Sequence, residues 1–564
     1  MRWKISEKIN KEFVTKYPDI DPVILQLLHN RNIESKEEID SFLNSKYEDL
    51  HDPFLFNDME KLVSRVKKTV ELNEIVYVYG DYDADGVCSS ILMVEALRKV
   101  GIKEVGVYIP HREHEGYGLN NKAIDHIKSK GTNLIITVDC GTSNVKEVAY
   151  AKSLGIDVII LDHHKEPPEL PKEVTAILNP HLTDEKYPFK NLAAVGVVFK
   201  VVQALWKSFN LEIGKEKWFL DIVCIATIAD MMDLTGENRI LVKYGLVVLN
   251  KTKRVGLNSL INTLQYKSKE LGVYEVGFLI GPRINAAGRI EHATGAYELL
   301  ETSDTAEADS LAQTLNTTNL SRQSETKRIL DEALEQVRTQ LESNKVLIAK
   351  GDTWSAGVVG LVSGRITQEF YRPSLVVTKT EKGITGSGRS IPGFNITDAL
   401  EKSSEYLESF GGHEGACGFT LKSDKELDDF VSTMNNIAEK EIKEEDLEKK
   451  IDVDTELLFD NINFNLVEEV DQLAPFGMGN TTPKFVSFGV RIDDMFLMGR
   501  DQNHIRLNLQ QNGKTLQAVG FGIGKKWGDI LNAGDLVDIV YDIGINEWNN
   551  KKDIQLKIVD IKKE

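Results

Sequence analysis

Cysteine is scarce in this 564-residue sequence, which contains four, at Cys88, Cys140, Cys224 and Cys417. No two of them form a Cys-x-x-Cys pair, so the sequence indicates neither a structural zinc site nor a disulfide framework. Scattered single cysteines are typical of small buried side chains in a reducing compartment. We therefore expect a cytoplasmic protein that is held together by hydrophobic cores.

Long apolar runs are also absent. No stretch reaches the roughly 18 to 20 residues that span a bilayer, and Met1-Arg2-Trp3-Lys4 leads into polar sequence without the apolar core of a signal peptide. Membrane insertion is therefore not expected, and because nothing argues for an oligomer, we expect a monomer. The hydrophobic fraction of 41% and the charged fraction of 27% are typical of a folded soluble protein.

Positive charge is in deficit, because the formal net charge is −19. Contacts with phosphates usually require a basic surface, so this balance argues against a protein that binds duplex nucleic acid without specificity. It does not exclude a metal-dependent nuclease, since such an enzyme has an acidic centre and needs only a local basic groove.

From residue 75 onward, short apolar runs alternate with helical patterns. Strands and helices are predicted in turn at 75–79, 87–100, 105–109, 121–130, 134–138, 145–154, 158–161 and 176–178, and the helix at 87–100 is predicted to be amphipathic. This alternation is typical of βαβ units and a parallel sheet. The predicted fold class is α/β, with a parallel-sheet catalytic domain, a long connecting helix, a second α/β domain and a C-terminal β-barrel.

Changes in pattern divide the chain into five expected segments. They are an N-terminal segment at 1–50 with helical patterns at 22–29 and 36–43, a catalytic domain at 51–265, a connecting motif with long helices at 266–343, a second α/β domain at 344–450 and a β-barrel at 451–564. The family resemblance described below implies that the second α/β domain binds substrate and that the barrel binds nucleic acid.

Three carboxylates, Asp81, Asp83 and Asp85, follow the strand at 75–79. A single Asp there would most simply cap the next helix, where its charge suits the helix dipole. Three at alternate positions would repel one another without a cation, which favours a divalent metal site. Gly86 permits a tight turn after them.

Two further strand ends carry polar side chains. Asp139 follows the strand at 134–138, and Asp162-His163-His164 follows the strand at 158–161. The carboxyl ends of parallel strands meet at one edge of a sheet, so Asp139 could bridge two metals there. Adjacent histidines point in different directions, so one can ligate a metal while the other donates to a phosphate or leaving group. Asp230 ends an apolar helix and is either a surface stop or a buried functional group.

The ordered set of motifs resembles the DHH phosphoesterase superfamily. The resemblance is carried by Asp81-Tyr82-Asp83-Ala84-Asp85-Gly86, Asp139-Cys140-Gly141, Asp162-His163-His164 and Ala229-Asp230. The later motifs are more similar to its bacterial single-strand-specific exonucleases, the RecJ family. They are Arg283-Ile284-Asn285-Ala286-Ala287-Gly288-Arg289, Gly411-Gly412-His413 and Ala416-Cys417-Gly418-Phe419.

The resemblance implies a 5′→3′ exonuclease that hydrolyses single-stranded DNA to 5′-mononucleotides in repair and recombination. Two ions would be held by Asp83, Asp85, Asp139, His163 and Asp230, with Asp139 bridging. Asp81 and His164 would take part in catalysis beside them. An oxygen-rich site with one imidazole suits Mn²⁺ or Mg²⁺ better than Zn²⁺, and the nitrogen ligand favours Mn²⁺.

The resemblance also implies a substrate groove. Arg283, Asn285 and Arg289 would donate to phosphate oxygens, although a structural salt-bridge cluster is the simpler alternative. Arg112 and Tyr117 follow the second strand and would face the same cleft, where Tyr117 could stack on a base.

A phosphate pocket is implied in the second α/β domain. Ser387 and Arg389, with Gly411, Gly412 and His413, would capture the 5′ end through backbone N–H groups, a guanidinium and an imidazole. One departure from the family pattern lies nearby, because Ser355 stands after Trp354 where a histidine is expected.

The C-terminal barrel resembles an oligonucleotide-binding fold, and it could close the groove into a ring too narrow for duplex. Its aromatic residues are expected mostly in its core; they are Phe485, Phe488, Phe521, Trp527 and Trp548. The resemblance alone suggests a single-strand-binding protein and a RecQ-type helicase as partners.

Two other functions stay open. A DHH phosphodiesterase that acts on very short RNAs or cyclic dinucleotides is one, although such relatives are shorter and usually lack the barrel. A non-catalytic binding protein on a degenerate scaffold is the other, although degeneration should first remove metal ligands and all five candidates are present.

Overall fold

The computed structural model describes residues 1–563 except 113, 267–269, 291, 382 and 549–550. The chain forms two compact units. The larger unit contains residues 52–230 and 245–449, and the barrel unit contains residues 1–51, 231–244 and 450–564. Among the described helices, none combines the length and the apolar composition that a membrane span requires.

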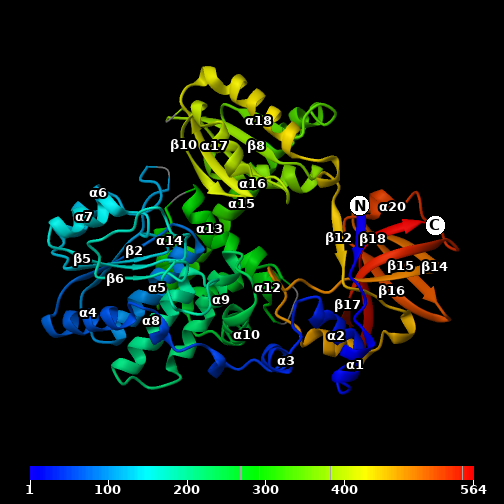
Figure 1. Cartoon of the computed structure of the whole chain (residues 1–564), viewed down its shortest axis with the longest axis horizontal. Coiled ribbons are helices and arrows are strands. Elements are labelled where there is room, and N and C mark those ends of the chain that lie inside the picture. Colours follow the sequence, from blue (N-terminus) through cyan, green and yellow to red (C-terminus); the bar gives the residue numbers. More distant parts are fainter. Residues whose placement is uncertain (113, 267–269, 291, 382, 549–550, 564) are drawn as a thin grey trace. The chain divides into compact units, whose positions relative to one another are not determined.

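The first part of the larger unit is a parallel sheet (Figure 1). Its strands are β2 (Val76–Gly80), β3 (Val105–Tyr108), β4 (Leu134–Val138), β5 (Asp157–Leu161) and β6 (Ala176–Leu178). They lie in the order β3-β2-β4-β5-β6 and all pairs are parallel, as predicted. The chain moves from β2 outward to β3 and then returns to β4 on the other side of β2. This reversal opens a crevice beyond the carboxyl ends of β2 and β4.

Helices cover both faces of this sheet. They are α4 (Met59–Leu72), α5 (Ala84–Lys99), α6 (Asn121–Ser129), α7 (Val145–Ser153), α8 (Ala194–Ser208) and α9 (Leu220–Ala229). Helices α6 and α7 share a core with one face of the sheet, and α4, α5 and α8 contact its strands from the other. The sequence predicted an amphipathic α5, but α5 is buried almost all round because α8 and α9 pack against it.

A helical connection follows. Its elements are α10 (Gly236–Leu249), α11 (Val255–Asn262), α12 (Val273–Glu275), the π-helical turn η4 (Val276–Ile280), α13 (Gly281–Ile290), α14 (Thr294–Glu301) and α15 (Thr305–Arg338). The long α15 was predicted as one or two helices and is continuous. It packs on α11, α13 and α14 along its first half and on α16 later, so it links the two α/β domains of this unit.

The second α/β domain is built on a mixed sheet of order β10-β11-β9-β8-β7. Its elements are β7 (Leu347–Gly351), α16 (Ala356–Phe370), β8 (Ser374–Thr380), β9 (Gly383–Arg389), α17 (Ile396–Lys402), β10 (Leu407–His413), β11 (Ala416–Leu421) and α18 (Leu427–Glu441). Along β8 the side chains alternate, so that Val376 packs with α15 and α16 while Leu375 and Val377 pack with α17 and α18.

The barrel unit contains a closed β-barrel in its C-terminal part. The barrel strands and their flanking elements are β12 (Lys450–Val453), β13 (Thr455–Glu456), α19 (Phe464–Asp471), β14 (Phe485–Met498), β15 (His504–Gln511), β16 (Lys514–Gly520), α20 (Gly524–Trp527), β17 (Leu536–Trp548) and β18 (Lys551–Lys563). The sheet order is β13-β14-β15-β16-β18-β17, and β17 pairs back onto β14. This closure removes free strand edges, as expected for an oligonucleotide-binding fold.

The N-terminal residues are part of the same unit. Strand β1 (Arg2–Ile5) pairs with β12. Three helices follow it in the sequence: α1 (Lys11–Lys16), α2 (Pro22–His29) and α3 (Lys36–Leu43). Apolar side chains of α2 share one core with barrel strands. Arg239 of α10 is 2% exposed and donates to the carbonyl oxygen of Leu473 at 2.7 Å.

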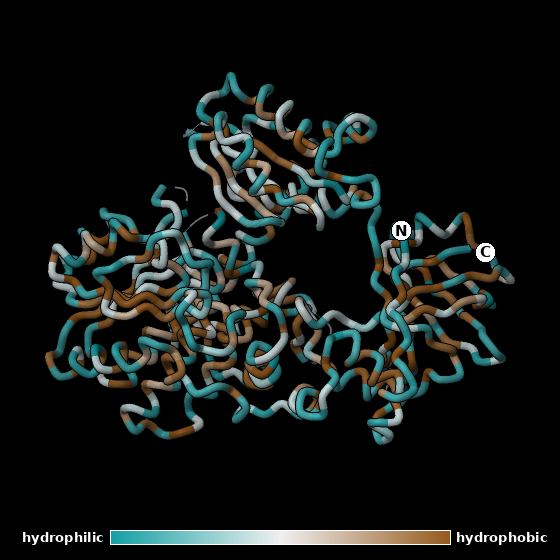
Figure 2. The backbone as a smooth tube through the Cα atoms, in the orientation of Figure 1, coloured by the Kyte–Doolittle hydropathy of each residue, from teal (hydrophilic) through white to brown (hydrophobic). Residues whose placement is uncertain are grey.

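Hydrophobic positions concentrate in the strands and buried helices of each unit (Figure 2). The barrel aromatics only partly follow the prediction. Phe485 is buried and Trp527 packs against the core, but Phe488 is 41% exposed and Phe521 is 63% exposed. The Trp548 side chain lies outside the described part of the chain.

Candidate active site

The loop between β2 and α5 brings its carboxylates to the crevice. Asp83 is the N-cap of α5 and its Oδ1 accepts from the backbone N–H groups of Asp85 and Gly86, at 2.9 and 3.1 Å. The capping role considered for one Asp is therefore real for Asp83. A Cβ at Gly86 would lie 2.5 Å from the carbonyl oxygen of Asp81. Glycine is thus required for close approach of loop and helix, rather than for an unusual turn.

Asp139 leaves β4 in a strained conformation. Its φ of 62° lies in the left-handed region, which non-glycine residues adopt rarely and often at functional sites. The residue is 2% exposed, and its Oδ1 is buried without a hydrogen-bond partner within the described chain. Asp81 Oδ1 is likewise buried without a hydrogen-bond partner among the described residues. Two buried carboxylate oxygens that accept no hydrogen bond are suited to direct contact with a cation.

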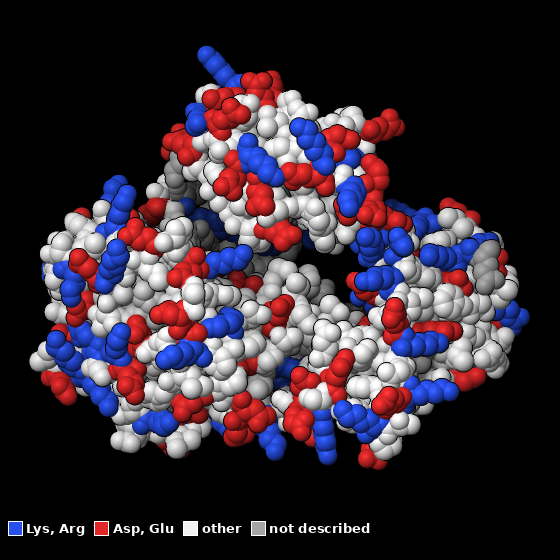
Figure 3. Space-filling view, viewed as in Figure 1, with Lys and Arg blue, Asp and Glu red and all other residues white. Residues whose placement is uncertain are grey.

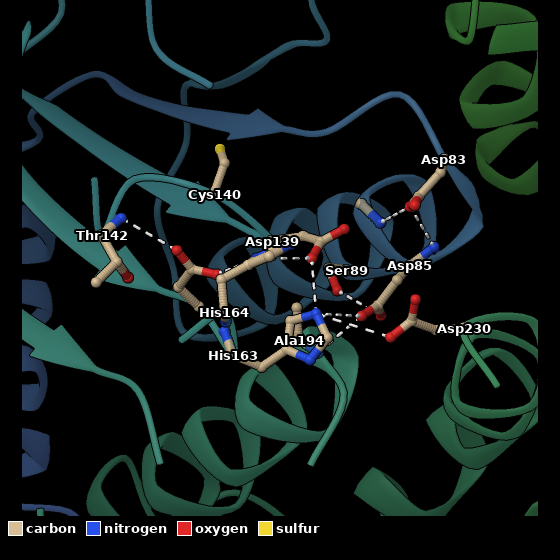
Figure 4. Close-up of polar contacts among 12 residues, drawn as sticks. Asp83, Asp85, Ser89, Asp139, Cys140, Thr142, His163, His164, Ala194 and Asp230 are labelled. Carbon is tan, nitrogen blue, oxygen red and sulfur yellow. Dashed lines mark hydrogen bonds and ion pairs between the residues drawn. The ribbon is translucent and has the colours of Figure 1, made fainter. Parts of the chain in front are cut away.

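The His163 imidazole is directed toward Asp139, Asp85 and Asp230 (Figure 4), whereas the His164 imidazole contacts Asp162. His163 Nε2 lies 3.2 Å from Asp139 Oδ1 and its side chain is 12% exposed. His164 is 49% exposed, and its Nδ1 lies 2.8 Å from Asp162 Oδ1. Asp162 also accepts from the Thr142 backbone N–H at 3.0 Å, so it orients His164 from within the fold.

Asp85 and Asp230 are the remaining carboxylates of the cluster. Asp85 accepts from the backbone N–H groups of Ala194 and Val195 at 2.7 and 2.9 Å, at the N-terminus of α8. Asp230 is the C-cap of α9. Their Oδ2 atoms lie 3.9 and 3.7 Å from His163 Nε2.

Three overlapping groups of ligand atoms result, with the atoms of each group within 4.8 Å of one another. The groups are Asp139, His163 and His164; Asp85, His163 and Asp230; and Asp81, Asp83 and Asp139. Asp139 and His163 each belong to two groups. This donor set, rich in carboxylate oxygens with imidazole nitrogen added, fits Mn²⁺ or Mg²⁺.

The electrostatics of the cluster favour the binding of a cation. Burial, followed by the neighbouring carboxylates, raises the pKa of Asp81, Asp139 and Asp230, and raises that of Asp85 to about 7. Burial lowers the pKa of His163 to about 4, so this imidazole is neutral and free to ligate at neutral pH.

The Asp162–His164 pair behaves in the opposite way. Burial alone would raise the pKa of Asp162, but the hydrogen bond from His164 and those from Thr142 hold it below its usual range. Burial opposes the charge on His164, yet the bond to Asp162 raises the pKa of this imidazole. His164 is therefore suited to carry a proton while His163 is not.

Helix α13 lies across the loop that follows β2. Asn285 Oδ1 accepts from the Ala84 backbone N–H at 2.8 Å, and a Cβ at Gly288 would lie 2.3 Å from the Tyr82 carbonyl oxygen. Arg283 is 9% exposed and donates to Asn316 Oδ1 and the Leu279 carbonyl oxygen. Its donors are thus used within the fold, in line with the structural alternative, although without acidic partners.

Arg289, Arg112 and Tyr117 lie toward the crevice. Burial and then Arg112 lower the pKa of Arg289 to about 10, and Arg289 donates to the Gly357 carbonyl oxygen at 3.2 Å. The Arg112 guanidinium lies 5.0 Å from the Tyr82 ring centre. The Tyr117 hydroxyl donates to the Asp139 carbonyl oxygen at 3.0 Å and lies 3.1 Å from His164 Nδ1. Tyr117 therefore holds two residues of the carboxylate–histidine cluster in position.

Ser387, Arg389, Gly411 and His413 share one face of the second domain's sheet, and Gly412, which pairs with Cys417, lies on the other. Register places Ser387 and Gly411 on either side of Gly418, and Arg389 and His413 on either side of Ala416. Gly411, Gly412 and His413 are exposed. Glycine side by side on β10 and β11 leaves the sheet surface bare, so an anion can approach the backbone there. The Ser387 hydroxyl itself donates to the Cys417 carbonyl oxygen at 3.0 Å.

The neighbourhood of Arg389 is hollow. A pocket of about 290 Å³ is lined by Thr367, Tyr371, Arg389, Ser390 and Lys449 among others. Ser355 is the N-cap of α16 without a side-chain capping bond, and Trp354 donates to Glu332 at 2.7 Å. Ser355, which stands where the family pattern has histidine, is thus at the start of α16. The neighbouring Trp354 has a structural role through its bond to Glu332.

Some site residues were not predicted. Asn179 follows β6 at the same sheet edge and donates from Nδ2 to the His164 carbonyl oxygen at 2.8 Å; its place after a strand was an available signal. The backbone N–H groups of Ala194 and Val195 carry no such signal, because any residue type can supply them.

The comparisons with known proteins first define a class. The model of the DHH family, N-terminal domain, matches residues 75–227, that of the DHHA1 domain matches 343–440, and that of the RecJ OB domain matches 453–560. The single-stranded-DNA-specific exonuclease RecJ of Bacillus subtilis (strain 168) is 39% identical over 99% of this chain and 70% of its own length. The chain belongs to the RecJ family of the DHH class.

Solved structures agree. The crystal structure of RecJ from Thermus thermophilus in complex with Mn²⁺ is similar with a TM-score of 0.85 and 25% identity, over 100% of this chain and 80% of that one. A second, in complex with Mg²⁺, shares the fold with a TM-score of 0.78 and 24% identity, over 100% of this chain and 78% of that one. Relatives have thus been solved with either ion.

Proposed function

We propose that this protein degrades single-stranded DNA from the 5′ end, releases 5′-mononucleotides and uses two divalent ions, Mn²⁺ or Mg²⁺. The observation that carries the proposal is the overlap of three ligand groups at Asp139 and His163, at the mouth of the β2–β4 crevice. Asp83, Asp85, Asp139, His163 and Asp230 would hold the ions, with Asp139 shared. When bound, such ions lower the pKa of a water and neutralise charge on the phosphate.

The remaining side chains have their own tasks. His164 is half-exposed and held by Asp162, which supports a role as proton donor to the leaving oxygen. Asp81 would take part beside it, since its buried Oδ1 has no partner within the described residues. Tyr117 fixes the orientation of both Asp139 and His164 through its hydroxyl group.

The 5′ end would be bound by the second α/β domain. The bare glycine surface of β10 and β11, with Ser387, Arg389 and His413 at its border, supports binding of a terminal phosphate. Arg112, Asn285 and Arg289 would contact the DNA strand between the site of the terminal phosphate and the two ions. Three further points stay predictions. They are the segment boundaries given above, the cytoplasmic location, and the partners, which would be a single-strand-binding protein and a RecQ-type helicase.

The test uses purified protein, Mn²⁺ and single-stranded DNA labelled at its 3′ end, beside a matched blunt duplex and a matched RNA. Progressive shortening of the single-stranded DNA with release of mononucleotides is the expected result. Hydrolysis of dinucleotides without cleavage of the long strand would instead assign the protein to the small-substrate phosphodiesterases.

A further inference from the structure

The carboxylate of Asp230 is held less directly than those of Asp83 and Asp85. Backbone N–H groups donate to Asp83 and Asp85, whereas Asp230 accepts no hydrogen bond from a described residue and lies 3.7 Å from His163 Nε2. Asp85 Oδ2 lies 3.9 Å from the same nitrogen, so the two carboxylates are close enough to repel each other. Acidic and basic side chains are mixed over the face shown in Figure 3, but like charges gather here, so the backbone must keep Asp230 in place.

Helix α9 fixes this backbone on one side only. Asp230 is the C-cap of α9, and its N–H donates to the Ala226 carbonyl oxygen at 2.9 Å. Met231, the next residue, has a φ of 57°, in the left-handed region. Residues 232–234 then form neither helix nor strand. A left-handed residue other than glycine persists only where its surroundings hold it, so the segment after Asp230 needs contacts from elsewhere in the fold.

Those contacts come from the turn formed by residues 475–480. The Leu234 N–H donates to the Met478 carbonyl oxygen at 2.7 Å. Gly479 lies directly against Asp233, because a Cβ at Gly479 would be 2.7 Å from the Asp233 Cβ. Both contacts lie within the barrel unit, which includes residues 231–244. The turn therefore holds the chain three and four residues after Asp230.

Buried hydrogen bonds hold the turn itself. Asn480 is 1% exposed, and its Nδ2 donates to the carbonyl oxygens of Leu473 and Pro475 at 2.8 and 2.9 Å. Its Oδ1 accepts from Arg31 Nε at 2.9 Å, and its carbonyl oxygen accepts from the Gly477 N–H at 2.8 Å. A buried amide whose donors and acceptor are all used fixes the backbone around it, so the turn is a rigid partner for residues 233 and 234.

We propose that the turn at 475–480 positions Asp230 for metal binding. Through Asp233 and Leu234 it sets the direction in which the chain leaves Asp230, and it thereby keeps this carboxylate in the metal site. Gly479 and Asn480 are thus positioning residues, which act through Asp230 and touch neither metal nor substrate. The inference rests on the proposed function, because it takes Asp230 as a metal ligand.

The ligand groups make the consequence specific. Asp230 belongs to the group with Asp85 and His163, and it is absent from the group of Asp81, Asp83 and Asp139. A displaced Asp230 should therefore weaken the binding of one ion and spare the other. A general loss of folding would weaken both.

The test compares Gly479→Ala with Gly513→Ala in the full-length protein. The two glycines have φ of 67° and 82°, so alanine strains the backbone at both positions. A Cβ at Gly513 meets nothing within 4 Å, whereas a Cβ at Gly479 pushes on Asp233. Mn²⁺ alone is titrated into each variant by calorimetry, and thermal melting checks the fold. Asp230→Asn and the double variant Gly479→Ala with Asp230→Asn complete a double-mutant cycle.

We expect Gly479→Ala to weaken the binding of one Mn²⁺ ion about tenfold or more, the range for a residue that orients a metal ligand, and to leave the other ion unchanged. Gly513→Ala should bind both ions like the wild type. In the Asp230→Asn background, Gly479→Ala should add little, because the ligand that the turn positions is already lost. Excess Mn²⁺ should restore cleavage of single-stranded DNA by Gly479→Ala.

Three results would overturn the inference: normal binding of both ions by Gly479→Ala, an equal loss of both, or a full further loss in the Asp230→Asn background. If Gly479→Ala does not fold, Asp233→Gly removes the same contact from the other side and should weaken the same ion, more than Asp233→Ala does. Binding of two ions without cleavage of single-stranded DNA would refute the proposed function and leave this inference standing.

Discussion

Two clusters of like charge lie in the larger unit, and they differ in one respect. Asp81 and Asp139, beyond β2 and β4, are buried and each has an oxygen that accepts no hydrogen bond from a described residue. Arg289, Arg322 and Arg389, on α13, α15 and β9, are half-buried and form no ion pair with a described carboxylate. The acidic cluster can relieve its repulsion by taking up protons, because burial raises the pKa of Asp85 to about 7. The arginines cannot do the same, since even a pKa of about 10 leaves Arg289 charged at neutral pH.

This difference teaches what each cluster needs. Protons and metal ions compete for the carboxylates, so the metal site should depend on pH. Only an anion can relieve the arginines, so their site should respond to phosphate rather than to pH.

The strongest test of the acidic cluster is Asp139→Asn. Asparagine tolerates the left-handed backbone of this position but removes a carboxylate shared by two ligand groups. We expect Mn²⁺-dependent cleavage to fall by more than the ~10- to 100-fold typical of an outer-shell partner. Nuclease assays and calorimetric Mn²⁺ titration check this, with exposed Asp331→Asn as control. Full activity would remove Asp139 from the metal site.

The comparison predicts a pH dependence of metal binding. Below about pH 7 the Asp85 carboxyl is protonated, and burial also raises the pKa of Asp81, Asp139 and Asp230. Mn²⁺ affinity should therefore rise from pH 6 to pH 8 with release of protons, as measured by calorimetry in buffers of different ionisation enthalpy.

The metal-free protein should show the opposite trend in stability. A carboxyl whose pKa is raised by folding stabilises the fold when protonated, so the free energy of unfolding should fall as pH rises through about 7. Thermal melting with and without Mn²⁺ between pH 5 and pH 8 tests this. An Mn²⁺ affinity that does not change between pH 5 and pH 8 would contradict the expected difference between the carboxylate cluster and the arginines.

The arginine cluster should be stabilised by inorganic phosphate. If the dissociation constant is near 1 mM, 10 mM phosphate adds about 1.4 kcal/mol to the free energy of unfolding. Melting in phosphate against chloride of equal ionic strength measures this. Arg289→Gln should reduce the gain, and Arg328→Gln, at an arginine paired with Glu325 and Glu332, should not. An equal gain in all three proteins would mean that phosphate acts elsewhere.

The smallest expected effect concerns Tyr117, which joins Asp139 and His164. Tyr117→Phe removes a hydroxyl that donates to the Asp139 carbonyl oxygen, so we expect a loss of activity of about 2- to 10-fold, the range for one neutral hydrogen bond. Tyr150→Phe is the control, because its hydroxyl bonds the exposed Asp125 on the same sheet face. A loss above a hundredfold would mean that Tyr117 acts in the chemistry.

Much of the fold followed from local pattern. The strands β4 and β6 were predicted with the bounds that the structure gives, and α2 and α3 likewise. These elements are short, have clear apolar periodicity and end at turn or capping residues, so local physics specifies them. The prediction failed for α5, whose surroundings are set by α8 and α9, and for Phe488 and Phe521, whose exposure depends on barrel register.

The sequence by itself determined which residue types stand at the ends of strands, and hence that carboxylates and histidines would meet at one sheet edge. Only the tertiary structure decided how they meet, through the left-handed backbone of Asp139 and the α8 N–H groups that hold Asp85. It also decided the packing of α13 on α15, where Arg283 donates to Asn316. The reason is physical. Strand ends are set by neighbours in sequence, whereas contacts between helices 30 or more residues apart depend on packing that no local pattern encodes.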